Sequence, residues 1–409
     1  MSLEAARALD AADPLKDFRG RFALPDGVIY LDGNSLGPLP KSARARLAEV
    51  AEREWGEGLI RSWNDAGWID APARVGDKIA RLIGAAPGEV IVADSTSVNL
   101  YKLLVAALGA RPGRRAILTE TGNFPTDLYI AGGAASAAPG TEVRAVAPEA
   151  VEAAIDADTA VVLLTHVHYK TARRRDMARL TAAAHAAGAL MLWDLSHSAG
   201  AVPLDLTACG VDLAVGCGYK FLNGGPGAPA FLFVAERLQS ELTSPLTGWM
   251  GHAAPFDFTD AWRPAAGIGR FFTGTPPILG LAVLEAGVDI ALEADAGALA
   301  AKSERLWILF AELMAARLPG AGFRLITPAE ASARGSHISY AHPEGYRIMQ
   351  ALIARGVIGD FREPDVIRFG LTPLYLGFED VWRAVDILAE IVAGEAWKAQ
   401  APRAVGRVT

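Results

Sequence analysis

The sequence predicts an α/β fold in which a mostly parallel sheet is covered by helices on both faces. Short apolar runs alternate with longer helical patterns along most of the chain. The runs are continuous rather than alternating, as expected for strands that are buried on both faces, and their alternation with helices favours a parallel sheet. The predicted strands are Glu89–Ala93, Arg115–Thr119, Ala160–Thr165, Ala189–Trp193, Val211–Val215 and Ala228–Val234.

Helical patterns lie between these strands. We expect helices over Ser97–Leu108 and over Arg175–Ala187, the second of which ends at Gly188 because glycine adopts the left-handed conformation that stops a helix. From about Leu279 the chain becomes helical and then forms short strands, Ser336–Tyr340 and Val366–Leu371. The pattern therefore predicts a large α/β domain and a smaller α+β domain, with boundaries at residues 1–45 (an N-terminal segment packing on the small domain), 46–285 (large domain) and 286–409 (small domain).

Composition narrows the function classes. The chain has 409 residues, of which 51% are hydrophobic and 21% charged, with a net charge of −7. An acidic chain gives no electrostatic support to nucleic-acid binding. The start, Met1–Gly20, lacks a secretory signal, and no apolar run is long enough to span a membrane. The two cysteines, Cys209 and Cys217, form no disulfide framework, so we expect a cytoplasmic protein.

An acid and a lysine end two neighbouring predicted strands. Asp194 closes the run Ala189–Trp193, and Lys220 follows the run Val211–Val215. Pyridoxal 5'-phosphate (PLP) enzymes need a lysine that forms a Schiff base with the cofactor and a carboxylate that pairs with its pyridinium nitrogen. A lysine at a strand end can also simply extend its ammonium to solvent. The combination with Asp194 favours a PLP site.

Other residues near these strand ends have two interpretations each. Thr96 and Ser97 open a predicted helix, where hydroxyls and backbone amides either bind the cofactor phosphate or only cap the helix. Phe124 can stack on a pyridine ring or pack as a core residue in a proline-containing loop. Asp127 can add negative charge near the ring nitrogen. His197 either contacts the cofactor or is a hydrogen-bonded core histidine.

Two further features concern metals and substrate. His166 and His168 face the same side of a strand end, but no carboxylate or cysteine partner is evident, so we expect no metal. Arg368 lies in a late strand between Ile367 and Phe369, where a guanidinium is costly to bury without an anion. A substrate carboxylate would suit its planar fork.

These pieces, in this order, resemble the kynureninases, which are PLP enzymes of fold type I (aspartate-aminotransferase-like) in the class-V aminotransferase superfamily. The resemblance covers nearly the whole chain. The lysine region is typical of the whole superfamily, whereas Phe-Pro-Thr-Asp, Gly-Trp-x-Gly-His and Thr-Pro-Pro-Ile together are far more specific. The matching segments are Tyr30–Gly37, Asp94–Leu100, Phe124–Asp127, Trp193–Gly200, Tyr219–Gly227, Gly248–His252, Thr273–Ile278 and Arg368–Tyr375.

The resemblance implies a role for each matched residue. Lys220, Tyr219 and Asp194 would be catalytic, Arg368 would bind the substrate carboxylate, and Trp63 would line the aryl pocket. Trp249 and Thr275 would approach the cofactor phosphate from a neighbouring subunit, which implies a homodimer with a shared site. The cofactor-binding set would be Thr96, Ser97, Phe124, Pro125, Thr126, Asp127, Thr165, Asp194, His197, Tyr219, Lys220, Trp249 and Thr275. Thr165 and Thr275 replace residues common in the family but keep a hydrogen-bonding group.

The implied reaction is hydrolysis of L-kynurenine, and of 3-hydroxykynurenine as an open alternative, to anthranilate (or 3-hydroxyanthranilate) and L-alanine in tryptophan catabolism. It cleaves the Cβ–Cγ bond of the substrate. A cysteine desulfurase would need a nucleophilic cysteine after Lys220, and none occurs. A class-V aminotransferase is opposed only by the Gly248–His252 resemblance. A non-catalytic PLP-binding regulator would need an added DNA-binding domain, which we do not expect before Tyr30.

Overall fold

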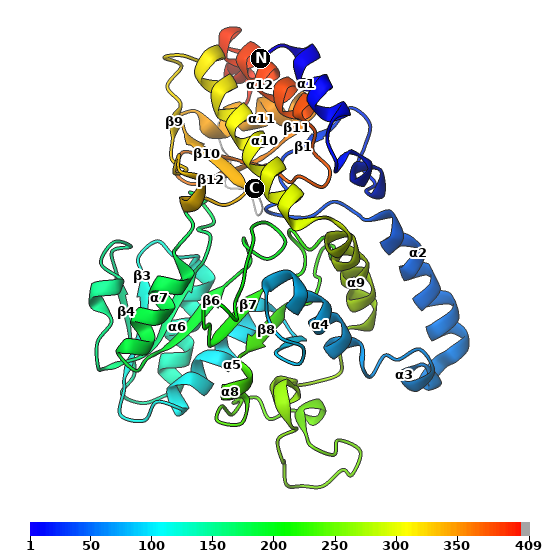
Figure 1. Cartoon of the computed structure of the whole chain (residues 1–409), viewed down its shortest axis with the longest axis vertical. Coiled ribbons are helices and arrows are strands. Elements are labelled where there is room, and N and C mark those ends of the chain that lie inside the picture. Colours follow the sequence, from blue (N-terminus) through cyan, green and yellow to red (C-terminus); the bar gives the residue numbers. More distant parts are fainter. Residues whose placement is uncertain (402–409) are drawn as a thin grey trace. The chain divides into compact units, whose positions relative to one another are not determined.

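The computed structural model of the chain describes residues 1–401 (Figure 1). The chain divides into two compact units. The first unit contains residues 1–42, 169–174 and 293–401, and the second contains residues 43–168 and 175–292. The short segment 169–174 thus belongs to the first unit although both of its neighbours in sequence belong to the second.

The second unit is built on a seven-stranded sheet with the strand order β2-β8-β7-β6-β5-β3-β4. Strand β8 runs antiparallel to both of its neighbours, and the other pairings are parallel. The strands are β2 (Val90–Val92), β3 (Ala116–Glu120), β4 (Glu142–Val146), β5 (Thr159–Thr165), β6 (Leu190–Asp194), β7 (Leu213–Gly216) and β8 (Phe231–Val234).

Helices cover both faces of this sheet (Figure 1). One apolar core joins the sheet to α4 (Ala71–Ile83), α7 (Met177–Ala186) and α9 (Ile278–Glu293). A second core joins the opposite face to α5 (Thr96–Gly109) and α6 (Pro125–Ala137). Because helices cover both faces of the sheet, side chains on both sides of the central strands are buried and the strands are almost entirely apolar. Shorter α-helices are α2 (Lys41–Glu49), α3 (Ser62–Asp65) and α8 (Glu236–Gln239).

The first unit has its own antiparallel sheet, with the order β12-β13-β10-β9, and a separate parallel pair, β1 with β11. The helix pairs α10 with α12, α1 with α12 and α11 with α12 are in contact. The strands are β1 (Ile29–Tyr30), β9 (Arg324–Leu325), β10 (His337–Ala341), β11 (Val357–Ile358), β12 (Asp360–Arg362) and β13 (Val366–Gly370). The helices are α1 (Leu3–Ala11), α10 (Ala296–Arg317), α11 (Gly345–Ala354) and α12 (Phe378–Ala393).

The predicted α/β class and mostly parallel sheet are confirmed, and each of the six predicted strands has a counterpart. Strand β4 was not predicted. It lies at the sheet edge, where Glu142 is exposed and Arg144 is half-buried, so it lacks a continuous apolar run. The predicted helix from Arg175 begins at Met177 instead, because the Asp176 side chain accepts a hydrogen bond from the backbone of Arg179 at 3.0 Å and caps it. Within residues 1–401, no helix is both long and apolar enough to cross a membrane.

Candidate active site

The site begins where two parallel strands end. Thr165 is the last residue of β5 and Asp194 the last of β6, and the two are direct partners in the ladder. Carboxyl ends of parallel strands meet at one edge of the sheet, where ligands bind in open α/β folds. The Asp194 carboxylate is fixed there, because its Oδ1 accepts a hydrogen bond of 2.8 Å from the backbone of Ser196.

A second carboxyl group comes from the first turn of α6. Phe124 is the N-cap of this helix and Pro125 its first residue, a position where proline loses no hydrogen bond. Thr126 follows, and Asp127 is buried. The Thr165 hydroxyl lies 3.3 Å from Asp127 Oδ2. It also lies 2.5 Å from the side-chain oxygen of Asn123, so α6 is tied to the end of β5.

The two buried carboxyl groups create a demand for positive charge. Burial raises the pKa of Asp127 well above its ordinary value, and the nearby Asp194 charge raises it further. Burial likewise raises the pKa of Asp194, and the charge of Lys220 opposes that increase. Protonated carboxyls in a dry site become ionised when a cation is placed beside them. A protonated pyridine nitrogen is such a cation, so the pair fits the ring of PLP.

Lys220 lies just beyond the end of β7. The turn before it requires glycine, because a Cβ atom on Gly218 would lie 2.4 Å from the carbonyl oxygen of Pro229. The Lys220 Nζ atom is buried and lies 3.0 Å from His197 Nε2. It also lies 5.9 Å from the centre of the Phe124 ring and 5.7 Å from that of Tyr219. The structure thus brings together four residues that the sequence predicted for one site.

The amino terminus of α5 supplies a place for an anion. Its N-cap is Ser95, whose side chain accepts a hydrogen bond from the backbone of Val98 at 3.4 Å. Thr96 and Ser97 therefore occupy the first turn rather than the capping position. Backbone amides at a helix start and neighbouring hydroxyls suit a phosphate.

A buried ion pair connects this helix to a distant loop. Lys102 on α5 is fully buried, and its Nζ donates to Asp94 Oδ2 and to the carbonyl oxygen of Phe271, each at 2.7 Å. The Thr273 hydroxyl donates to the same Asp94 oxygen at 2.8 Å. Asp94 itself has a backbone φ of 49°, which is uncommon for a residue with a side chain. The network therefore fixes both the start of α5 and the loop that leads to Thr275.

We predict that Lys102→Met destabilises the protein. The change keeps the side-chain volume but leaves Asp94 without its cation. We expect it to lower the free energy of unfolding by about 2–3 kcal/mol, less than for a fully buried pair because the Asp94 side chain is 27% exposed. Urea unfolding of the two proteins measures the difference. Lys78→Met is the matched control, since Lys78 is paired in a more exposed position and should lose about 1 kcal/mol or less. Equal losses for both variants would contradict the prediction.

Three further predicted residues share one pocket. Trp63, Trp249 and Thr275 line a cavity of about 590 Å³ in the second unit. Its remaining walls are mostly apolar, formed by Ile60, Asn64, Ile69, Met250 and Phe256. The predicted aryl-pocket residue and the two predicted phosphate residues are thus neighbours, although they come from distant parts of the sequence.

Arg368 lies in the first unit and is almost fully buried. Its cross-strand partner is Asp360, and Arg368 Nε donates to Asp360 Oδ1 at 2.6 Å. The guanidinium also donates to the Tyr169 carbonyl oxygen, and to the Ser35 hydroxyl at 3.1 Å. A buried arginine needs an anion, and within the protein Asp360 already provides one.

Comparison with known proteins identifies the family. A kynureninase of Pseudomonas fluorescens is 54% identical to this chain over 396 residues, which is 95% of each protein. A kynureninase of Burkholderia pseudomallei strain K96243 is 52% identical over 402 residues, 97% of each protein. The chain belongs to the kynureninase family. A family model, the kynureninase C-terminal domain, also matches residues 299–388.

Solved structures confirm the fold that the kynureninase resemblance implied. The chain resembles the apo structure of a cysteine desulfurase from Thermococcus onnurineus, with a TM-score of 0.78, 18% identity, and coverage of 93% of this chain and 98% of the other. A cysteine desulfurase from Escherichia coli gives a TM-score of 0.77 at 19% identity, covering 95% and 99%. At this identity the likeness shows the shared PLP fold type I alone.

Several residues that contact the predicted residues of this kynureninase-family chain were not themselves predicted from sequence. Asn123 precedes the Phe124–Asp127 motif, and Lys102 resembles any lysine on a helix. Asp360 could have been found by asking which acid pairs with a buried arginine. The two histidines considered for a metal have other contacts, His166 Nδ1 with Ser198 Oγ and His168 Nε2 with the Gly122 carbonyl oxygen, both at 2.9 Å. Among residues 1–401, no group of three or more potential metal ligands gathers.

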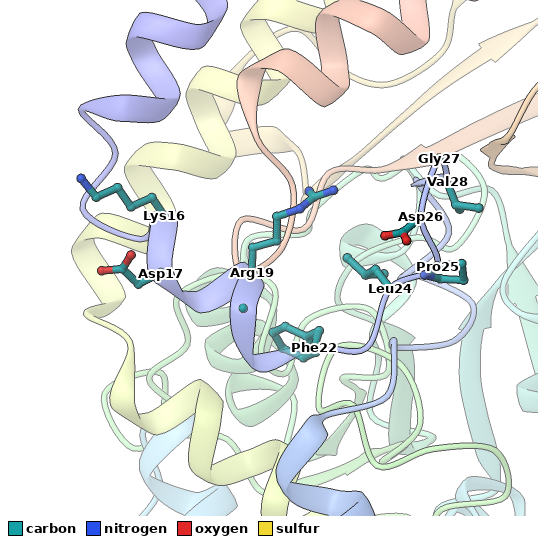
Figure 2. A pocket seen from close by; sticks show the side chains of 10 residues that line it. Lys16, Asp17, Arg19, Phe22, Leu24, Pro25, Asp26, Gly27 and Val28 are labelled. Carbon is teal, nitrogen blue, oxygen red and sulfur yellow. The ribbon is translucent and has the colours of Figure 1, made fainter.

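The first unit also has a charged surface pocket of about 510 Å³ near its amino terminus (Figure 2). Lys16, Asp17, Arg19 and Asp26 supply its charges, and Phe22 lies at its edge. Arg19 is already used within the fold, since its Nη1 donates to the Tyr375 carbonyl oxygen at 2.6 Å.

Proposed function

We propose that the protein hydrolyses L-kynurenine to anthranilate and L-alanine with PLP as its cofactor. The observation that carries this function is the buried arrangement of Lys220 with Asp194 and Asp127 in a chain 54% identical to a kynureninase. When bound, PLP supplies the electron sink that stabilises negative charge on the substrate carbon atoms. An assay of anthranilate formation tests the activity.

The described residues would hold each part of the cofactor. Lys220 would bind its aldehyde and Phe124 would lie against its ring. Asp194 and Asp127 would keep the ring nitrogen protonated. Both carboxyl groups are buried and have raised pKa values, so a cation placed beside them is stabilised when they ionise. The phosphate would take the amides and hydroxyls at the start of α5. We include in this set Thr96, Ser97, Pro125, Thr126, Thr165, His197 and Tyr219.

Proton transfer at the substrate is assigned to two neighbouring side chains. We propose that Lys220 removes the proton from Cα and that Tyr219 delivers one to Cβ after the Cβ–Cγ bond breaks. The Tyr219 ring lies beside the Lys220 ammonium, with 5.7 Å between Nζ and the ring centre. His197, 3.0 Å from the same Nζ atom, is placed to position it. Water attacks the side-chain carbonyl, which makes the reaction a hydrolysis.

A homodimer with a shared site is part of this proposal. Trp249 and Thr275 would contact the phosphate bound by the other subunit, with Trp63 near the aryl group of the substrate. The pocket that these residues line carries unusually exposed apolar side chains, Ile60 at 77%, Phe256 at 62% and Trp249 at 44%. Exposed apolar groups gathered around a pocket are typical of an interface. We also propose that the enzyme acts in the cytoplasm.

We propose that Arg368 binds the substrate carboxylate. Its buried guanidinium is held by Asp360, Ser35 and the Tyr169 carbonyl oxygen, which together fix the direction of the N–H on Nη1 that these contacts leave over. A donor held in a fixed direction loses little entropy when a carboxylate binds. The role rests on this geometry and on the family resemblance.

The Arg368→Gln variant tests that role. We expect kcat/KM for L-kynurenine to fall by about 10²–10³, because a charge-assisted, fixed contact of about 3–4 kcal/mol is lost. The amine analogue of kynurenine that lacks the carboxylate should be a poor substrate for both proteins, with nearly equal kcat/KM. A similar fall for kynurenine and for this analogue would show that Arg368 acts on the fold rather than on the carboxylate.

A further inference from the structure

The surroundings of Arg368 contain more charge than a single ion pair. Arg362 Nη2 also donates to Asp360, at 2.8 Å from Oδ2. The Ser35 hydroxyl donates to the same Asp360 oxygen at 2.9 Å. Because Arg368 in turn donates to Ser35, the two arginines, Asp360 and Ser35 form one connected cluster in the first unit, in which Arg368 and Asp360 are buried and Arg362 and Ser35 are half-buried.

The backbone places a second carboxyl group, that of Asp32, beside this cluster. Leu31 lies between the two strands that carry the cluster, since its N–H donates to Ile358 and its carbonyl oxygen accepts from Gly370, both at 2.7 Å. The Ser35 N–H donates to the Asp32 carbonyl oxygen at 2.9 Å, which closes the turn between the two residues. Asp32 Oδ1 is buried and accepts no hydrogen bond from residues 1–401.

The net charge of this cluster together with Asp32 depends on whether the Asp32 carboxyl group is protonated. Arg362 and Arg368 contribute two positive charges, and Asp360 contributes one negative charge. When Asp32 carries its proton, the cluster has an excess positive charge that attracts a carboxylate. When Asp32 is ionised, the four charges cancel and the attraction is lost. A change in net charge alters the binding of an anion most where little water screens the charges.

We propose that Asp32 is a specificity-determining residue whose proton sets the affinity of Arg368 for the substrate carboxylate. The inference deepens the proposed function and rests on the role of Arg368 given there. Asp32 acts through the cluster rather than by touching the reacting atoms.

The electrostatic surroundings of Asp32 place its titration in the working range. Burial raises the pKa of Asp32 to about 7, and the Asp360 charge contributes in the same direction, against the opposing effects of Ser35, Arg368 and Arg362. Asp360 differs, because the hydrogen bond and charge of Arg368 outweigh its burial and lower its pKa. The other titratable groups that face Asp32 are Tyr30 and Tyr375, whose pKa values burial raises, so both stay neutral.

The affinity for the substrate carboxylate falls as the pH rises. Below about pH 7 Asp32 is neutral, the cluster is positive and the carboxylate binds well. Above that pH Asp32 is ionised and KM for L-kynurenine rises. We expect a rise of about three- to tenfold between about pH 6 and 8, with little change in kcat from this group.

The test compares the holoenzyme of Asp32→Asn with the wild type over this range. Asn has the shape of the neutral acid, so the variant should keep the low KM of the acidic wild type at every pH. Asp32→Glu should restore the pH dependence, and Asp26→Asn, at an exposed position of the same segment, should behave as wild type. A KM that still rises with pH in Asp32→Asn would overturn the inference.

A measurement on the wild type alone covers the case in which Asp32→Asn does not fold. Inhibition by a non-reactive kynurenine analogue should weaken with pH, whereas inhibition by its counterpart without the carboxylate should not. Equal pH dependence of the two inhibitors would also overturn the inference. If Arg368→Gln leaves KM unchanged, the carboxylate role fails and the Asp32 inference fails with it. If Arg368→Gln raises KM and Asp32→Asn remains pH-dependent, only the inference about Asp32 fails.

Discussion

Replacing Lys220 with alanine should lower kcat for L-kynurenine by at least about four orders of magnitude, because in the proposed function Lys220 both binds PLP covalently and acts as the base at Cα. The fold should be retained, since Lys220 ends a turn and its Nζ contacts His197 rather than the apolar core. Absorbance spectra should show PLP bound without its covalent link. Lys41→Ala, at an exposed position, is the control and should have wild-type activity.

Mixing variants extends this experiment to the proposed dimer. Lys220→Ala and Trp249→Ala each damage a different half of a shared site. A mixed dimer would have one site with both defects and one with neither, so combining the inactive proteins under conditions of subunit exchange should restore part of the activity. No restoration, although exchange is shown by labelled subunits, would mean that each subunit works alone.

Replacing Asp194 with asparagine should lower kcat by about 10³, which corresponds to about 4 kcal/mol of lost transition-state stabilisation. The physical reason is that an amide cannot hold the proton on the pyridine nitrogen, so the ring accepts electrons less well. The buried hydrogen bond from Ser196 should survive, because the amide oxygen can still accept it. Stopped-flow or steady-state kinetics of anthranilate release measure the change.

Asp127 provides the internal comparison for this prediction. Its carboxyl group is buried beside Thr165, and in the proposed function it also faces the protonated ring nitrogen. It lies on α6, however, and not at the end of β6. We expect Asp127→Asn to lower kcat by about tenfold, well below the effect at Asp194. Equal losses at the two positions would mean that the two carboxyls act as a unit and that Asp194 is not the principal partner of the ring.

Most of the second unit could be predicted from the sequence because each of its central strands is recognisable from its own short run of apolar residues. The central strands are buried on both faces, so each is apolar throughout, and Asp194 and Lys220 interrupt that pattern where two of them end. The edge strand β4 was missed because its half-exposed residues, such as Arg144, resemble a loop. The family motifs then predicted individual site residues more specifically than periodicity could.

Side-chain pairs between distant segments could not be predicted in the same way. Lys102 and Thr273 meet at Asp94 only because the fold brings a helix and a late loop together. Asp360 pairs with Arg368 through the register of β12 with β13, which the sequence does not encode in any short motif. The raised pKa of Asp32 could not be predicted for the same reason, since it arises from burial and from the charge of Asp360.

The stoichiometry of the reaction products decides whether the protein hydrolyses L-kynurenine. The purified protein, loaded with PLP, is incubated with L-kynurenine, and anthranilate and alanine are quantified over time. We expect equimolar anthranilate and L-alanine, with neither formed by Lys220→Ala. Absence of anthranilate from both L-kynurenine and 3-hydroxykynurenine, with PLP bound at Lys220, would contradict this expectation and leave the fold and the cofactor with a different reaction.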